Sequence, residues 1–180
     1  MLDTWQQLLE EDQSENRSVV VGTLEYRALR ERDAARRQRV REGLLVERDL
    51  TPEALYSAAW ILNHGDEVQE AALAHVLARR AALAGFEPAK WLCAAADDRS
   101  RMYAGQPQKY GTNSVPDGRG YRLWDVDPMT TDAERAAWNV PPLAELQRRV
   151  EVLSRTAPQP PLEDAPRWLR DAIARWYPHE

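Results

Sequence analysis

The residues best suited to acid/base chemistry lie at a predicted junction between two helices. His64 and Asp66 are separated only by Gly65, so the carboxylate could orient the imidazole as a general base. The simpler alternative is that His64 ends one helix and Asp66 caps the next, which requires no chemistry. On this segment alone, capping is the stronger interpretation.

A second group of polar residues lies where a predicted helix ends and a long loop begins. Asp98 directly precedes Arg99, and a carboxylate that held the guanidinium would leave its planar fork free for a substrate carboxylate or phosphate. The same pair also fits an ordinary charge run at a helix end. The loop adds uncharged hydrogen-bonding side chains on both sides of Gly111, namely Gln108, Tyr110, Thr112 and Asn113.

The order of these residues resembles an uncharacterised bacterial domain family, known only as a domain of unknown function. Its members pair an early Asp-Gln and Arg with a Gln-His-Ala-Asp segment, an Asp-Arg and a Gln-x-Tyr-Gly-Thr-Gln loop. The likeness covers about residues 5 to 152. The residues that carry it are Asp12, Gln13, Arg17, His64, Gly65, Asp66, Gln69, Asp98, Arg99, Gln108, Lys109, Tyr110, Gly111, Thr112 and Asn113.

The chain departs from the family pattern at a few of these positions. Asn63 stands where the family has Gln, Gly65 replaces Ala, Asn113 replaces the final Gln, and the spacing to Arg17 is one residue longer. The resemblance implies no known activity. It does imply that the matched polar side chains share a pocket, which adds Gln13 and Arg17 to the expected substrate-binding residues.

More specific catalytic motifs are absent from the sequence. There is no Gly-rich phosphate loop after a strand, no Gly-x-Ser-x-Gly, no His-Glu-x-x-His and no paired Cys-x-x-Cys. Nucleotide-binding, serine-hydrolase and zinc-hydrolase interpretations therefore lack support, no metal ligand is assigned, and the cofactor is unknown. The single cysteine, Cys93, falls in an Ala-rich apolar segment, where a core position is the simpler interpretation.

Composition narrows the classes of protein. The chain has 180 residues, a net charge of -5 and an isoelectric point near 5.4, which argues against a general nucleic-acid binder. No apolar run reaches the length of about 18 residues that a membrane span needs. One cysteine and an N-terminus without a signal-like pattern favour a cytoplasmic location.

Helix-start and helix-stop signals predict a mainly α-helical fold. A first helix is expected over about 4 to 17. A charge-dense helix over 24 to 42 is either solvated, with i,i+4 pairing, or packed against a partner elsewhere. Three further helices begin at Thr51-Pro52-Glu53, at Asp66 and at Pro88. Because short turns join these three, we expect an antiparallel bundle.

The helical period vanishes between about 103 and 128, and glycines and prolines punctuate that insertion. Lys109 to Val115 and Tyr121 to Val126 flank a Pro-Asp-Gly turn signal and could form a small β-hairpin. The predicted organisation is a helical domain over 1 to 155, a proline-rich linker over 156 to 166, and an amphipathic helix over 167 to 178.

Two functions remain open. The favoured hypothesis is an enzyme for a small polar or anionic ligand, with a pocket between the 64 to 66 junction, the end of helix 88 to 101 and the 104 to 126 loop. His64, Asp66, Asp98 and Tyr110 would be catalytic there. The alternative is a non-catalytic immunity, antitoxin or regulatory protein. It would use the Arg-rich helix or the C-terminal helix, and the latter could also form a homodimer.

Overall fold

A computed structural model describes residues 4–16, 19, 23–47, 49–163 and 165–178. Within these residues the chain is mainly α-helical, with a small two-stranded antiparallel sheet. This confirms the predicted fold class. The element bounds are Thr4–Asn16 for α1, Leu24–Val46 for α2, Pro52–Asn63 for α3, Val68–Leu83 for α4, Ala89–Tyr103 for α5, Ser114–Pro116 for β1, Tyr121–Leu123 for β2, Asp132–Ala137 for α6, Leu143–Thr156 for α7 and Arg167–Trp176 for α8.

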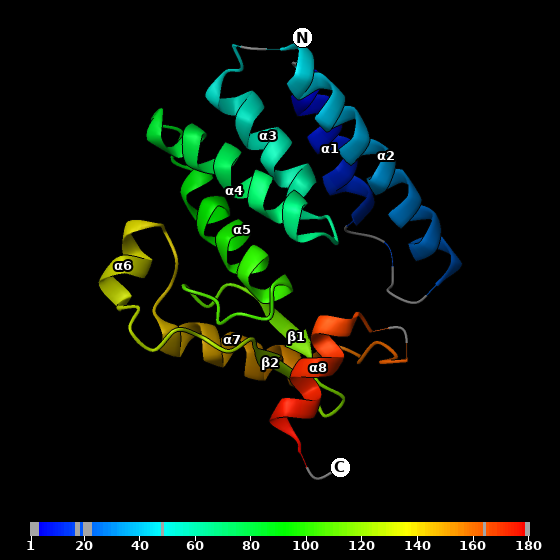
Figure 1. The fold of residues 1–180 in the computed structure, drawn as a ribbon, viewed down its shortest axis with the longest axis vertical. Helices are drawn as coiled ribbons and strands as arrows, with labels where there is room; N and C mark the ends of the chain where they lie inside the picture. The colour runs from blue at the N-terminus through cyan, green and yellow to red at the C-terminus, as the bar shows by residue number, and fades with distance from the viewer. Residues whose placement is uncertain (1–3, 17–18, 20–22, 48, 164, 179–180) are drawn as a thin grey trace.

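Helices α1 to α5 form the upper half of the molecule in Figure 1, with consecutive helices antiparallel. Thr51 caps α3 by accepting a hydrogen bond from the N–H of Ala54, and Pro52 occupies the first turn, as the sequence predicts. Alanines on α3, α4 and α5 are buried between these helices. Their small side chains let the three helices pack closely, and this apolar cluster is the main core.

The start of α4 differs from the prediction. Its N-cap residue is Glu67, which makes no side-chain capping hydrogen bond. Asp66 instead forms an ion pair with Arg30 of α2. Capping therefore does not explain Asp66, because its carboxylate is engaged by a neighbouring helix.

Helix α2 is packed within the chain, so of the two expectations for this charge-dense segment the packed helix holds and the solvated helix does not. Its inward stripe is Leu29, Asp33, Arg36 and Val40, all of which are buried. The spacing is that of a helix face packed against a core, but its two central positions carry charges. These two charges, Asp33 and Arg36, pair with each other, and Arg36 also pairs with Glu15 of α1.

The insertion contains the expected hairpin in a shorter form. β1 pairs antiparallel with β2, and the Asp117 carboxylate accepts hydrogen bonds from the N–H groups of Arg119 and Gly120 in the turn. The segments that flank this hairpin are held by a few backbone hydrogen bonds, such as that from the N–H of Trp124 to the carbonyl of Asn113, and by side chains of the loop and of α5. None of the described helices combines the length and the apolar character that crossing a bilayer requires.

Helix α8 lies against the hairpin in the lower half of Figure 1. Its Leu169 and Ala172 are buried in a second cluster with Met102, Val115 and Trp124. The apolar stripe of the C-terminal helix is therefore used within its own chain. A homodimer through this helix stays a prediction, and it would have to use another face of α8.

Candidate acid/base site

The candidate site lies at one end of the bundle, where α1 and α3 end. His64 is the C-cap residue of α3, and its Nδ1 lies 2.9 Å from Oδ2 of Asp12 on α1. Asp12 is completely buried, whereas 21% of the His64 side chain is exposed. The two atoms are within ion-pairing distance but are not aligned as a hydrogen bond. Catalytic hydrogen bonds often align only when a ligand is bound.

Helix α2 brings two arginines to this end of the bundle. Arg30 donates to the backbone carbonyl of His64 at 3.2 Å and pairs with Asp66. Arg36 contacts Asp33 at 2.9 Å and Glu15 at 2.6 Å. Hydrogen bonds from Arg36, and next from Arg32, lower the pKa of Glu15. Both guanidinium groups are thus held by carboxylates of the same chain.

Arg99 approaches the same junction from α5. Its Nη1 donates to the backbone carbonyl of Asn63 at 2.5 Å, and its Nε is buried without a hydrogen-bond partner. Cations are favourable beside the carbonyls that end a helix, so Arg30 and Arg99 both stabilise the end of α3. Unlike Arg30, Arg99 forms no ion pair among the described residues.

Tyr103 closes the junction from the last turn of α5. Its hydroxyl donates to the carbonyl of Gly65 at 3.0 Å. Burial raises the pKa of Tyr103, although the nearby Arg99 acts in the opposite direction. The phenol therefore stays protonated at neutral pH and fixes the glycine turn between His64 and Asp66.

Aromatic rings border His64 along α3. The ring of Trp60 lies 5.7 Å from that of His64, between ring centroids. Trp91 of α5 stacks on Trp60 with a centroid distance of 5.9 Å and an interplanar angle of 27°. The imidazole thus has a carboxylate on one side and indole rings on another.

Asp98 has a different role from the predicted catalytic one. Its Oδ1 accepts the N–H groups of Lys109 and Tyr110 at 2.7 and 2.8 Å. Its Oδ2 accepts the N–H and hydroxyl of Thr112 at 2.9 and 2.8 Å. Burial raises the pKa of Asp98, while these donors act to lower it. Asp98 and Thr112 therefore anchor the loop to α5.

Gln108 and Asn113 also organise the loop. The buried Gln108 side chain donates to the carbonyls of Asn113 and Trp124 at 3.0 and 2.9 Å, and it accepts the N–H of Asn113 at 2.9 Å. The Asn113 amide donates to the carbonyl of Ala95. These amides add to backbone hydrogen bonds that Gln108 and Asn113 make with the Trp124 to Asp127 segment, and both side-chain polar atoms of Gln108 are engaged.

Tyr110 lies away from His64. Its ring packs with Ala94, Val140 and Leu146, and burial, followed by the nearby Asp97, raises its pKa to about 12. Asp97 and Arg99 are two residues apart on a helix, so they point about 200° apart. The structure therefore separates Tyr110 from the Arg99 side of α5.

Of the two substrate-binding residues predicted in the N-terminal segment, Gln13 and Arg17, the structure describes only Gln13. Gln13 is half-buried on α1, next to Asp12 in the chain. Arg17 lies outside the described residues. Of the predicted site residues, the structure thus brings His64, Asp66 and Arg99 to one junction, where Gln13 is a chain neighbour of Asp12.

Sequence reasoning missed Asp12 as a site residue, although the family resemblance includes it. It also missed Arg30, Asp33 and Arg36 of α2. Their spacing relative to Leu29 and Val40 was the available signal, because Asp33 and Arg36 continue the inward stripe of those two residues. A charged pair inside such a stripe indicates a buried polar cluster.

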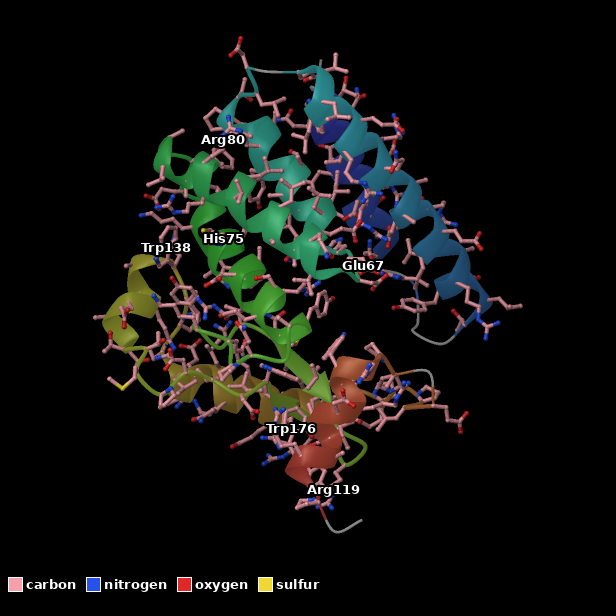
Figure 2. All side chains as sticks on the ribbon, in the orientation of Figure 1. Glu67, His75, Arg80, Arg119, Trp138 and Trp176 are labelled. Carbon is pink, nitrogen blue, oxygen red and sulfur yellow. The ribbon has the colours of Figure 1, made fainter. Side chains whose placement is uncertain are left out.

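Other side chains with titratable or nucleophilic groups lie away from the His64 junction. In Figure 2, Glu67 marks the start of α4 and His75 lies farther along that helix, where its Nδ1 contacts the carbonyl of Cys93 at 3.0 Å. Burial raises the pKa of the Cys93 thiol to about 11. Among the described residues, no three His, Cys, Asp or Glu side chains gather closely enough to hold a metal ion.

A groove of about 770 Å³ lies between α7 and the segment that follows β2. Its walls include Arg122, Asp127 and Gln147, and it contains none of the predicted site residues. The candidate site therefore rests on the His64 cluster. Comparison of the chain with protein-family models, curated proteins and solved structures found no match.

Proposed function

We propose that the chain is an enzyme that acts on a small polar or anionic molecule by acid/base chemistry, with His64 as the group that transfers the proton. The observation that carries this proposal is the 2.9 Å contact between His64 Nδ1 and the buried Asp12 carboxylate. A carboxylate that accepts the Nδ1 proton favours one tautomer, which leaves the lone pair of Nε2 for a substrate proton.

The buried charge of Asp12 also stabilises the imidazolium that forms when His64 accepts a proton. Asp12 is thus a positioning residue, and the partly exposed imidazole is the group that contacts substrate. Arg99, whose charge is not matched by an ion pair among the described residues, is placed to hold an anionic group of the substrate.

The alternative, a non-catalytic interaction protein, depends on the Arg-rich helix or the C-terminal helix. The buried arginines of α2 are paired within the chain, as Arg36 with Asp33 and Arg37 with Glu70 illustrate. The apolar face of α8 packs on Met102 and Trp124. The buried arginines of α2 and the apolar face of α8 are thus engaged within the chain, whereas Arg27 and Arg39 of α2 are exposed.

Turnover of generic substrates tests this function. The purified chain is assayed with p-nitrophenyl phosphate, bis(p-nitrophenyl) phosphate and p-nitrophenyl acetate. Loss of a general acid/base group lowers turnover by roughly 100-fold or more, so we expect that loss for His64→Gln on any substrate that is turned over. His75→Gln is the matched control and should keep wild-type turnover. No turnover of any substrate, or equal rates for His64→Gln and wild type, would contradict the proposal.

A further inference from the structure

An aromatic row leads along one face of the bundle to His64. Tyr56, Trp60 and His64 are spaced four residues apart on α3, and such residues share one face of a helix. The ring of Tyr56 meets that of Trp60 edge to face at 6.4 Å. Trp91 of α5 stacks on Trp60 from the side. The row therefore combines two helices and ends at the imidazole.

This row differs from the tryptophans that fill the core. Trp5 and Trp124 are buried and donate their indole N–H groups to Glu47 and to the carbonyl of Gln106. Trp91 is 36% exposed and Trp60 is half-buried. Among the described contacts, neither of their indole N–H groups has a hydrogen-bond partner. Flat surface and polar groups thus remain for a ligand.

A positive charge lies at the His64 end of the row. Arg99 reaches the carbonyl of Asn63, and it has no carboxylate partner among the described residues. Asn63 and His64 follow Trp60 by one helical turn, which is about 5.4 Å along the axis. Because Trp60 and Trp91 stack on each other, a ligand ring would pack against the exposed part of this pair, and a substituent that points along α3 would lie toward Arg99 and His64.

We infer that the substrate of this site is an aromatic or heteroaromatic molecule that carries a phosphate or carboxylate close to its ring. The ring packs against the exposed part of the Trp60–Trp91 pair, the anion pairs with Arg99, and His64 acts on the bond or proton beside it. Aromatic stacking supplies affinity for any flat ring. This inference rests on the proposed acid/base role of His64 and adds the class of substrate.

Binding of matched probe pairs tests the aromatic subsite. Calorimetric titration compares phenyl phosphate with ethyl phosphate, and benzoate with propionate, using the full chain. We expect the aromatic member of at least one pair to bind about tenfold more tightly, which is the scale of one stacked ring. Trp91→Leu should remove that preference. Trp138→Leu, which changes a half-buried tryptophan outside the row, is the control and should keep it.

The outcomes separate the inference from the proposed function. Equal affinity within both pairs overturns the aromatic subsite, and the turnover assay of His64→Gln is unaffected by that result. A preference that survives in folded Trp91→Leu also overturns it. If none of the four probes binds, both the inference and the proposal of an anionic substrate are overturned. If the anion pairs with Arg99, Arg99→Gln should abolish binding.

Discussion

At the scale of single residues, Asp12 is the clearest sign of function. A fully buried carboxylate is costly unless a partner compensates its charge. Among the described residues, the atom within ion-pairing distance of the Asp12 carboxylate is Nδ1 of His64. An imidazole carries a positive charge only when it is protonated. The arrangement therefore contributes less to stability than a permanent ion pair would, which fits a group kept for chemistry.

Asp12→Asn tests this interpretation. We expect turnover to fall by at least about 100-fold, because the amide no longer favours the required tautomer or stabilises the imidazolium. The free energy of unfolding should stay equal or rise, since a buried charge is removed. Urea denaturation and the turnover assay measure the two effects. Glu11→Gln, an exposed change on the same helix, should leave both unchanged.

For Asp98, in contrast to Asp12, we expect a substitution to lower the stability of the fold. In Asp98→Ala, the N–H groups of Lys109, Tyr110 and Thr112 lose their acceptor. Because buried unpaired donors are costly, we expect the free energy of unfolding to fall by about 3 to 5 kcal/mol. Asp97→Ala, which breaks a half-exposed pair with Arg101, should cost under about 1 kcal/mol. Equal costs for the two variants would refute the anchoring role of Asp98.

The residues expected to share a site lie together where they meet at one helix end, and they lie apart where they share only a motif. His64 and Arg99 meet at one junction because α3 and α5 run in the same direction. Asp98 is adjacent to Arg99 in the chain, but consecutive helical residues point about 100° apart. Asp98 therefore faces the loop, and Tyr110 follows it to that side.

At the scale of elements, a cap signal predicted the start of α3 but not that of α4. Thr51 and Pro52 start α3, and Thr131 with Glu134 forms a capping box at α6. Local sequence determines such features, because the partners lie within one turn. Asp33 pairs with Arg30 and Arg36 of its own helix. Because Arg36 also pairs with Glu15 of α1, periodicity alone could not predict this buried cluster.

The contact between α8 and the hairpin should depend on pH. Burial raises the pKa of Asp117, but hydrogen bonds from the Tyr177 hydroxyl and the N–H groups of Arg119 and Gly120 outweigh it, so that this pKa is lowered. A lowered folded-state pKa gives stability that is present above the unfolded pKa of about 3.9 and is lost as the pH falls through the folded value.

We therefore expect the free energy of unfolding to decrease in that acidic window, and Asp117→Asn to remove part of the decrease. Urea denaturation between pH 7 and pH 2.5 provides the measurement. Asp171→Asn, an exposed carboxylate on α8, is the control and should keep the wild-type profile. An Asp117→Asn profile parallel to the wild type would show that this contact does not contribute.

At the scale of the whole molecule, the two halves have different cores. The bundle core is built from α1 to α5, whereas the second core joins the hairpin to α8 around Trp124. Figure 2 shows Arg119 and Trp176 in this lower half, far from His75 in the bundle. The predicted mainly helical class is confirmed. The intramolecular docking of α8 was unpredictable, because an amphipathic stripe does not specify which surface buries it.

Leu169→Asp tests that docking. Leu169 is buried among Met102, Val115 and Trp124, so a charge there should detach α8 and lower the free energy of unfolding by about 3 kcal/mol or more. Urea denaturation followed by tryptophan fluorescence measures this effect. Arg167→Asp, at an exposed position of the same helix, should be nearly neutral. An unchanged stability of Leu169→Asp would contradict docking within the chain.

The protonation of the His64 imidazole most directly tests the central claim that Asp12 prepares it for proton transfer. A long-range proton–nitrogen NMR spectrum under alkaline conditions, where imidazoles are neutral, reports which nitrogen carries the proton, and His64→Gln assigns the signal. We predict a proton on Nδ1 and a bare Nε2, with that preference lost in Asp12→Asn. A proton mainly on Nε2 of the wild type, or a tautomer that Asp12→Asn leaves unchanged, would contradict the account.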